Sequence, residues 1–210
     1  MIKILVIDDH AIVREGLKQI LAETRDIIVA GEASDGYQAL DQIRKGNYDM
    51  VLLDIAMPGM GGLDILKQLK SERPALPILM LSMYPEEQYA VRTLKAGASG
   101  YLTKGSAPEE LISAIRKVCT GGKYVTSSLA EKLASYLEAN LERPAHELLS
   151  DREYQVMLMV ASGKTVTEIA AELSLSVKTI STNRIRALRK MGMKTNAEFT
   201  YYAIKHDLVH

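Results

Sequence analysis

Five short apolar runs, separated by amphipathic stretches, organise the first 120 residues of the chain. Each run is nearly unbroken, which is typical of a parallel strand buried on both faces, and the stretches between the runs have helical spacing. The predicted strands are Ile4–Ile7, Ile28–Gly31, Met50–Leu53, Ile78–Leu81 and Gly100–Thr103. The predicted helices are Val13–Ala22, Gly36–Lys45, Gly62–Arg73, Glu86–Ala96 and Pro108–Thr120. This alternation predicts an α/β fold, a (βα)5 doubly wound parallel sheet.

From Ser150 onward the pattern indicates only helices, and their starts carry side chains that can cap the first turn. Three segments match the capping-box pattern: Ser150 to Glu153, Thr165 to Glu168 and Thr195 to Glu198. Ser176 can cap a fourth helix, and Ser106 with Glu109 predicts a further capping box beside Pro108. The helices are expected at 151–161, 166–173, 177–191 and 196–206. We therefore predict a small all-α four-helix domain of the helix-turn-helix type.

The two patterns are joined by a segment of different composition. A short polar helix is predicted over Ser127–Leu141, and the residues from Glu142 to His146 then break the periodicity, as an interdomain linker would. We predict a first domain at 1–121, a linker with a short helix at 122–147 and a second domain at 148–210. A chain of 210 residues is long enough for two small cores.

The composition and the N-terminal sequence indicate the cellular compartment. The only cysteine, Cys119, has no partner for an internal disulfide, and no spacing suggests a zinc site, which fits a reducing compartment. The N-terminus becomes acidic at Asp8, too early for a signal peptide, and no stretch approaches a membrane span. We expect a cytoplasmic protein without membrane contact. Although the net charge is zero, the segment between Ser176 and Met191 is basic, because it contains lysines and arginines and no acidic residue.

Polar side chains stand at the carboxyl ends of four of the five apolar runs. In chain order they are Asp8 with Asp9, Asp54, Ser82 and Lys104. Ligands bind outside the carboxyl ends of the strands in open parallel sheets, so we expect these side chains to meet at one edge. We interpret His10, which follows the acidic pair, as a loop residue at the start of the first helix and not as a ligand or base.

Three clustered carboxylates repel one another and are normally tolerated around a hard cation that prefers oxygen ligands, so we predict bound Mg²⁺. A carboxylate beside this ion can attack a phosphoryl donor, and Asp54 is the best-placed nucleophile because it stands alone after its strand. Lys104 would then pair with one phosphoryl oxygen, and Ser82 would donate a hydrogen bond to another.

These residues carry a resemblance to a known family. The set Asp8-Asp9, Asp54, Met57-Pro58-Gly59, Ser82, Tyr101 and Lys104 resembles the receiver domain of two-component response regulators. The segments 149–153, 168–173 and 178–182 resemble the LuxR-type helix-turn-helix. Together they resemble the NarL/FixJ class, which implies a flavodoxin-like receiver followed by a DNA-binding domain. The chain departs from the family pattern at Gly105, where proline is often found, and at Gly61, where a polar residue is common.

The resemblance also implies residue roles. Asp54 would accept a phosphoryl group from the phosphohistidine of a sensor histidine kinase, and Ser82 and Tyr101 would form the switch pair. The implied Mg²⁺ contacts are Asp9, Asp54, the backbone carbonyl of Ala56 and, mainly through a bound water, Asp8. Phosphorylation would promote dimerisation and promoter binding. The implied partners are therefore the kinase, double-stranded promoter DNA and a second copy of the chain, with RNA polymerase as a candidate.

The predicted helix at 177–191 has the features of a DNA-recognition helix. Its inward face is expected to be Ile180, Ala187, Leu188 and Met191. The candidate DNA contacts are Lys178, Thr179, Ser181, Thr182, Asn183, Arg184, Ile185, Arg186 and Arg189. In the last helix we expect an inward face of Ala197, Tyr201, Ile204 and Leu208. Phe199 and Tyr202 are left over, either for a dimer contact or to cover the core.

Two other functions stay open. A constitutive DNA binder could use its receiver for dimerisation alone, but no residue of the acidic site is missing. A Mg²⁺-dependent phosphatase or phosphotransferase could use a similar sheet, but Ala56 stands where a second carboxylate would be needed. We therefore predict a transcription regulator switched by phosphorylation of Asp54, and not an enzyme.

Overall fold

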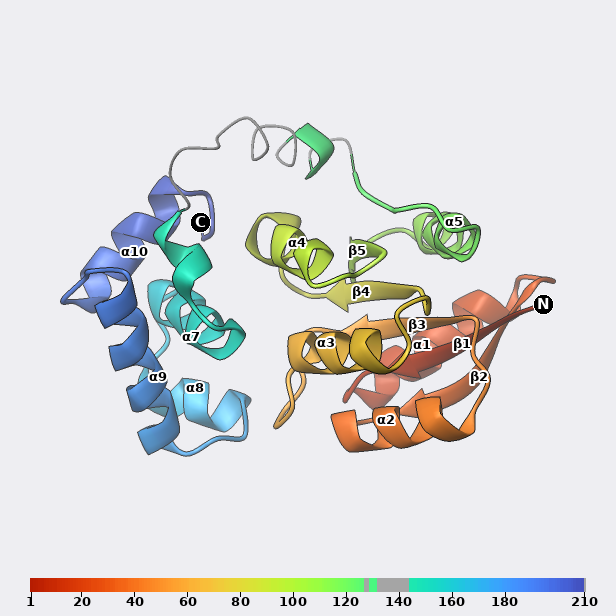
Figure 1. Ribbon diagram of the computed structural model, residues 1–210, viewed down its shortest axis with the longest axis horizontal. Coiled ribbons are helices and arrows are strands. Elements are labelled where there is room, and N and C mark those ends of the chain that lie inside the picture. Colours follow the sequence, from red (N-terminus) through yellow and green to blue (C-terminus); the bar gives the residue numbers. More distant parts are fainter. Residues whose placement is uncertain (127–128, 132–143, 210) are drawn as a thin grey trace. The chain divides into compact units, whose positions relative to one another are not determined.

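The protein consists of two compact units, Met1–Ala130 and Glu131–His210. The computed structural model describes residues 1–126, 129–131 and 144–209. Most of the helix predicted over Ser127–Leu141 falls outside the described residues, and the predicted domain limits at 121, 122, 147 and 148 stay predictions. Figure 1 shows the helices and strands of both units.

The first unit contains one parallel sheet of five strands. They are β1 (Ile2–Ile7), β2 (Ile27–Ala33), β3 (Met50–Asp54), β4 (Ile78–Ser82) and β5 (Gly100–Thr103). The strand order is β2-β1-β3-β4-β5, and every neighbouring pair is parallel. The register pairs Ile7 with Leu53 and Asp54 with Leu81, so the residues that follow the strands line up at one edge. The predicted doubly wound sheet is confirmed.

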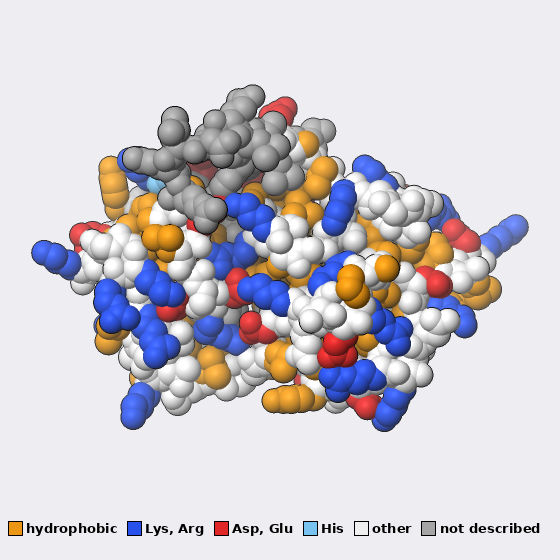
Figure 2. Space-filling view, viewed as in Figure 1, with side chains coloured by type: hydrophobic (Ala, Val, Ile, Leu, Met, Phe, Trp, Pro, Cys, Tyr) orange, Lys and Arg blue, Asp and Glu red, His pale blue; other side chains and the backbone are white. Residues whose placement is uncertain are grey.

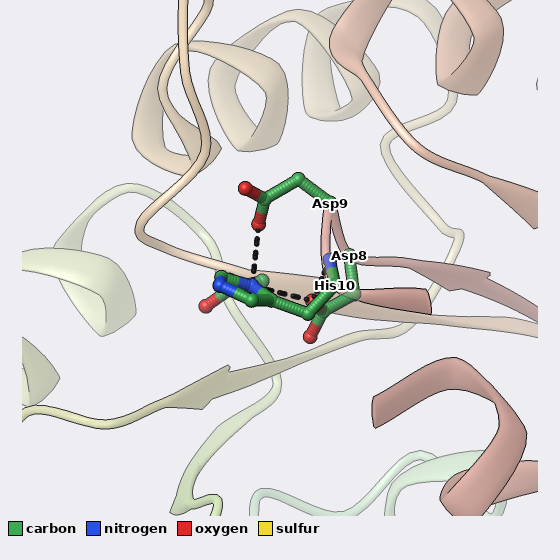
Figure 3. Close-up of side chains that lie close together, drawn as sticks. Asp8, Asp9 and His10 are labelled. Atoms are coloured by element: carbon green, nitrogen blue, oxygen red, sulfur yellow. Dashed lines mark hydrogen bonds and ion pairs between the residues drawn. The ribbon is translucent and has the colours of Figure 1, made fainter. Parts of the chain in front are cut away.

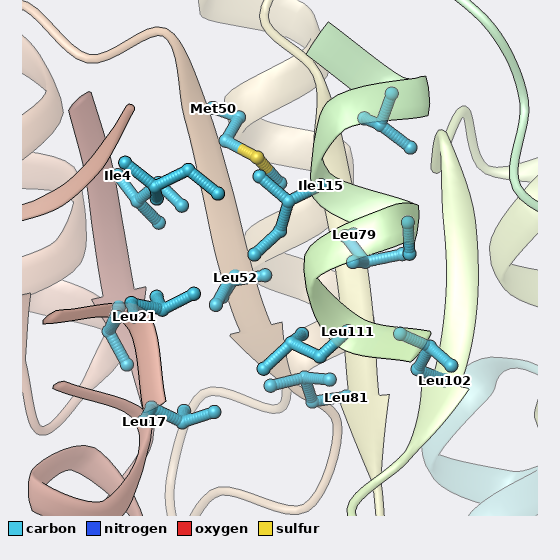
Figure 4. Close-up of a cluster of buried hydrophobic side chains, with 14 residues drawn as sticks. Ile4, Leu17, Leu21, Met50, Leu52, Leu79, Leu81, Leu102, Leu111 and Ile115 are labelled. Atoms are coloured by element: carbon cyan, nitrogen blue, oxygen red, sulfur yellow. The ribbon is translucent and has the colours of Figure 1, made fainter. Parts of the chain in front are cut away.

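Helices lie on both faces of the sheet (Figure 1). They are α1 (Ala11–Ala22), α2 (Gly36–Lys45), α3 (Gly62–Glu72), α4 (Glu86–Lys95) and α5 (Pro108–Cys119). The strands β1, β3, β4 and β5 are largely buried, whereas the edge strand β2 is partly exposed. On one face, α1 and α5 pack their apolar side chains onto alternate strand residues such as Ile4, Leu52 and Leu79 (Figure 4). This double burial explains why the strands have unbroken apolar sequences.

The capping box predicted at Ser106 is wrong. The N-cap residue of α5 is Ala107, which offers no side-chain bond, and Pro108 is the first helical residue. Ser106 instead shares a hydrogen bond of 3.3 Å between its Oγ and Thr103 Oγ1. Proline has a fixed φ and no N–H, so it suits the first helical position, and the helix begins at Pro108 as predicted although the capping box does not form.

The second unit is helical. Its described residues form a short 3₁₀ helix, η1 (Ala145–Leu148), and four α-helices, α7 (Asp151–Ala161), α8 (Val166–Glu172), α9 (Val177–Lys190) and α10 (Asn196–Lys205). The three predicted capping boxes at Ser150, Thr165 and Thr195 are present, and the Ser176 side chain accepts the Thr179 N–H. Among the described residues, no helix has the length and apolar character needed to cross a membrane.

The predicted inward face of α10 is mostly wrong. Phe199 and Ala203 are fully buried, whereas Tyr201 is 72% exposed and Ile204 is 56% exposed. Only Leu208, beyond the end of the helix, is buried as expected. Because this helix has apolar residues on two sides, periodicity alone could not identify which side the neighbouring elements would cover.

Candidate functional site

Three charged side chains from separate strands meet at the carboxyl edge of the sheet. Asp8 follows β1, Asp54 ends β3 and Lys104 follows β5. Lys104 Nζ lies 2.6 Å from Asp8 Oδ2 and 2.9 Å from Asp54 Oδ2. Both aspartates are 1% exposed, and no other described group donates a hydrogen bond to these two oxygens. The structure thus brings these residues together as the strand ends predicted.

Burial controls the ionisation of this group. It raises the pKa of the Asp54 carboxyl, and the nearby Lys104 offsets only part of that effect. Burial acts to lower the pKa of Lys104, but the two carboxylates hold it above its ordinary value. The ammonium therefore stays charged between two acidic groups, one of which is costly to ionise.

Asp9 and His10 lie beside Asp8 (Figure 3), and both are more exposed than Asp8. His10 Nδ1 lies 2.9 Å from Asp9 Oδ1 and 3.4 Å from Asp8 Oδ1. Asp8, Asp9, His10 and Asp54 can each offer one ligand atom within 4.8 Å of the others. Three carboxylates with buried oxygens fit the oxygen-rich site that Mg²⁺ prefers.

A tight turn follows β3 and contacts Asp54. The Ala56 N–H donates a hydrogen bond of 3.2 Å to Asp54 Oδ1, which orients the carboxylate. Gly62 packs so closely that a Cβ there would lie 2.0 Å from the backbone oxygen of Asp54. Glycine is therefore required at position 62. The only sign of this requirement in the sequence is the pair of adjacent glycines, Gly61 and Gly62.

The predicted switch residues lie beside this turn, on β4 and β5. Ser82 and Tyr101 are both fully buried. Ser82 Oγ accepts the N–H of Tyr84 at 3.0 Å, and the Tyr101 hydroxyl donates to the Tyr84 carbonyl at 2.7 Å. Burial raises the pKa of Tyr101, so its hydroxyl remains a donor. The inward ring of Tyr101 thereby holds the loop that follows Ser82.

The backbone at Lys104 is also defined. The Lys104 N–H donates to the Ser82 carbonyl at 2.7 Å, which ties the ends of β5 and β4 together. The Lys104–Gly105 peptide, whose geometry the sequence left open, is trans.

In the second unit, α9 presents a basic outer face (Figure 2). Its predicted inward residues Ile180, Ala187, Leu188 and Met191 are buried. Of the candidate DNA contacts, the exposed ones are Lys178, Thr179, Thr182, Ile185, Arg186 and Arg189, and the partly buried ones are Ser181, Asn183 and Arg184. Some of these side chains already have partners within the unit. For example, Arg184 Nη1 donates to Asn196 Oδ1 at 3.2 Å.

Sequence reasoning did not identify Glu153 as a buried carboxylate that contacts α9. Glu153 is 4% exposed, and its Oε2 accepts both the Ser150 N–H at 2.8 Å and Lys190 Nζ at 2.6 Å. The capping-box pattern identified Glu153, but it contained no signal for the pairing with Lys190. This contact links the first turn of α7 to the last turn of α9.

Two family models match the chain, one in each unit. Residues 4–116 match the response regulator receiver domain, and residues 147–203 match the bacterial regulatory proteins of the luxR family. The response regulator UvrY of Escherichia coli (strain K12) is 40% identical over 209 residues, which cover 99% of this chain and 96% of UvrY.

Solved structures of RcsB share the same architecture. RcsB from Salmonella enterica serovar Typhimurium, bound to promoter rprA in the presence of the phosphomimetic BeF3−, has a TM-score of 0.67 and 28% identity, over 96% of this chain and 97% of that chain. A structure of two RcsB dimers bound to two parallel DNAs has a TM-score of 0.59 and 28% identity, over 100% of this chain and 99% of that chain. With its parallel sheet, its acidic edge and its helical second unit, this chain belongs to the two-component response regulators of the NarL/FixJ class.

Proposed function

We propose that Asp54 is the phosphoacceptor of this regulator and that its phosphorylation by a sensor histidine kinase promotes dimerisation and promoter binding. The observation that carries the proposal is the buried Asp54 carboxylate, oriented by the Ala56 N–H and placed 2.9 Å from the Lys104 ammonium. Phosphorylation-dependent regulation is general to the family, which supports assigning the acceptor role to this position.

The reaction is a transfer between two nucleophiles. An Asp54 oxygen attacks the phosphorus of a phosphohistidine, the P–N bond breaks, and the histidine leaves with the electron pair and takes up a proton. Bound Mg²⁺, held by Asp9, Asp54 and the Ala56 carbonyl, with Asp8 acting through water, would neutralise charge on the transferring group. Lys104 would exchange its contact with Asp54 for a phosphoryl oxygen.

The proposed switch uses the neighbouring hydroxyl and ring. Ser82 would turn its hydroxyl from the Tyr84 N–H toward the phosphoryl group. The Tyr101 ring is already buried in this structure, so it would keep, and not newly take, the inward position that the resemblance implies for the active state. Because Tyr101 holds the Tyr84 carbonyl, a change at Ser82 alters the loop between β4 and α4. Such a switch needs only a small free-energy difference between receiver states, biased by the new phosphoryl contacts.

The DNA partner follows from α9. We propose that its outer side chains enter the major groove, with Ser181, Thr182 and Ile185 near base edges and the cations at phosphates. The RcsB structures contain promoter DNA and RcsB dimers, which supports double-stranded promoter DNA and a second copy of this chain as partners. RNA polymerase is a further candidate partner.

The first experiment measures the intact mass of the protein after incubation with acetyl phosphate and Mg²⁺. We expect the wild type and Asp64→Asn, which removes an exposed carboxylate of α3, to gain one phosphoryl group. Asp54→Asn should gain none. Phosphorylation of Asp54→Asn would place the acceptor elsewhere, and a wild type that stays unmodified with both acetyl phosphate and a histidine kinase would favour constitutive DNA binding.

The DNA interface is tested by binding isotherms at several salt concentrations. Lys178→Ala should weaken binding to all sequences and lower the slope of log K against log salt by about 1, because one phosphate contact is lost. Lys205→Ala, which removes an exposed cation at the end of α10, is the matched control and should leave the slope unchanged. Equal slopes for Lys178→Ala and wild type would remove this residue from the interface.

A further inference from the structure

The residues that follow α5 return to β5, the last strand of the sheet. Tyr124 forms a parallel bridge with Gly100, and its N–H donates to the Ser99 carbonyl at 2.9 Å. The Tyr124 hydroxyl also donates to Glu110 Oε1 of α5 at 2.8 Å. Gly100 permits this close approach, because a Cβ there would lie 2.7 Å from the backbone oxygen of Tyr124. The first residues of the predicted linker therefore pack as part of the first unit.

Two residues further on, Thr126 joins the linker to α4. Its hydroxyl donates a hydrogen bond to Oε2 of Glu86, the first residue of α4, and accepts the Leu129 N–H at 3.2 Å. The Thr126 carbonyl accepts the Ala130 N–H at 2.9 Å. Thr126 thus caps the helical turn that contains Leu129 and Ala130, and the same hydroxyl ties this turn to the receiver. The bond to the carboxylate orients the hydroxyl and makes its oxygen a better acceptor for the Leu129 N–H.

The position of Glu86 depends on the loop after Ser82. Pro85 is the N-cap residue of α4, so it alone separates Tyr84 from Glu86. The backbone of Tyr84 is held by two hydrogen bonds, from its N–H to Ser82 Oγ and from the Tyr101 hydroxyl to its carbonyl. When Ser82 turns its hydroxyl away, one of these two bonds is lost. The loop and the first turn of α4 can then shift, and the Glu86 carboxylate shifts with them.

We infer that the hydrogen bond between Thr126 and Glu86 couples the phosphorylation state of the receiver to the start of the linker. The inference rests on the function proposed above. In the unphosphorylated receiver the bond holds the turn at Leu129 in place. In the phosphorylated receiver Glu86 moves away, Thr126 loses its charged acceptor and the cap of this turn weakens. The receiver thereby changes the linker at the point where the chain leaves the first unit.

A contact that only stabilises the fold would look the same in the structure, but it predicts a different effect of removing the Thr126 hydroxyl. If the contact is purely structural, its loss weakens the turn equally in both receiver states and leaves the affinity for a phosphoryl mimic unchanged. If the contact exists in the unphosphorylated state alone, its loss favours the phosphorylated conformation. Coupling between two sites is reciprocal, so the variant then binds a phosphoryl mimic more tightly.

The test is titration of the whole chain with the phosphoryl mimic BeF3− in the presence of Mg²⁺, followed by tyrosine fluorescence. We expect Thr126→Val to bind BeF3− about 5-fold more tightly than the wild type, at the lower end of typical coupling factors. Thr126→Ser, which keeps the hydroxyl, should match the wild type. Thr120→Val is a second control, because the Thr120 hydroxyl donates only to the Lys117 carbonyl within its own helix end. Glu86→Ala should tighten binding as Thr126→Val does, and the double variant should gain nothing more, since both changes remove the same contact.

Hydrogen exchange of the Leu129 and Ala130 amides, followed by nuclear magnetic resonance, gives a second readout. Saturation of the wild type with BeF3− should speed this exchange by about 5-fold, whereas Thr126→Val should exchange fast with and without BeF3−. Unchanged BeF3− affinity in Thr126→Val, or unchanged exchange in the saturated wild type, would overturn the inference but leave the role of Asp54 intact. If BeF3− does not bind the wild type, or binds Asp54→Asn equally well, the proposed acceptor site itself is wrong and the inference fails with it.

Discussion

At the residue scale, the acidic site combines reactivity with a stability cost. Asp54 is buried beside a second aspartate, and the single Lys104 ammonium serves both carboxylates. An arrangement that leaves buried negative charge incompletely paired favours the binding of cations and phosphoryl groups, because these ligands add the missing partners. The same arrangement makes the unliganded receiver less stable than it could be.

Asp54→Asn should therefore stabilise the receiver. Burial raises the pKa of the Asp54 carboxyl, so the folded state favours its protonated form. This preference contributes fully to stability below the ordinary pKa of 3.8 and is lost as the pH rises through the higher pKa of the folded state. We expect the variant to exceed the wild type by about 1 kcal/mol in free energy of unfolding at neutral pH. Urea denaturation should show this difference narrowing as the pH falls.

Mg²⁺ provides the control for that experiment. The ion should raise the free energy of unfolding of the wild type more than that of Asp54→Asn, since it binds the folded site. A variant that is less stable than wild type at neutral pH would show that the lost pairing with Lys104 outweighs the relief of burial.

Tyr84 offers a second prediction at this scale. Its backbone is held by Ser82 and Tyr101, and its partly buried ring packs 5.2 Å from that of Tyr89, beside the end of β4. We expect the ring to shield the acyl phosphate from water. Tyr84→Ala should hydrolyse the phosphoryl group about 5-fold faster, which equals about 1 kcal/mol of barrier.

The measurement is the decay of the phosphorylated mass after removal of the phosphoryl donor. Tyr37→Ala, which removes a ring that is 76% exposed on α2, should decay at the wild-type rate. Unchanged decay in Tyr84→Ala would rule out shielding.

At the element scale, polar contacts stabilise both ends of α9. Ser176 caps its first turn, and Lys190 in its last turn pairs with the buried Glu153 of α7. Burial acts to raise the pKa of Glu153, but Lys190 and Ser150 hold it below its ordinary value of 4.5. The last turn of the helix proposed to bind DNA is thus held by one ionised carboxylate, in addition to the buried apolar face of α9.

Glu153→Gln should loosen this anchor. We expect the second unit to lose about 2 kcal/mol, because a buried charged hydrogen bond is lost and Lys190 is left without its partner. Hydrogen exchange of the α7 and α9 amides should measure the loss, which should shrink as the pH falls through the low folded pKa of Glu153. Glu168→Gln, at the exposed capping box of α8, should have a smaller effect. Equal effects would show that the contact with Lys190 adds nothing.

At the scale of the whole molecule, regulation requires phosphorylation in one unit to change assembly or binding in the other. The exposed side chains of Tyr201 and Ile204 on α10 give the second unit an apolar surface that a second copy of the chain can cover. A twofold dimer formed there would match an inverted-repeat DNA site.

Ile204→Glu should weaken the dimer of the phosphorylated protein by about 10-fold or more, because a charge would be buried in an apolar contact. Sedimentation velocity with and without acetyl phosphate would measure this change. Tyr37→Glu places a charge on another exposed aromatic position and should leave the dimer unaffected. Dimerisation of Ile204→Glu at wild-type strength would move the interface to another surface.

The sequence by itself determined the sheet, the capped helix starts of the second unit and the residues that meet at the acidic edge. Unbroken apolar runs require burial on both faces, and the residues that follow parallel strands must share one edge, so Asp8, Asp54 and Lys104 could be placed together in advance. The capping boxes at Ser150, Thr165 and Thr195 were equally predictable, because they depend on contacts within one turn.

Only the tertiary structure decided which side of α10 is buried, where Lys190 pairs and which way the His10 imidazole faces. Phe199 and Tyr201 lie two residues apart on one short helix, and the packing of α7 against α10, not local periodicity, buries the first and exposes the second. The ion pair of Lys190 with Glu153 joins residues 37 positions apart. Local patterns specify an element and its ends, whereas the contacts between elements depend on the assembled fold.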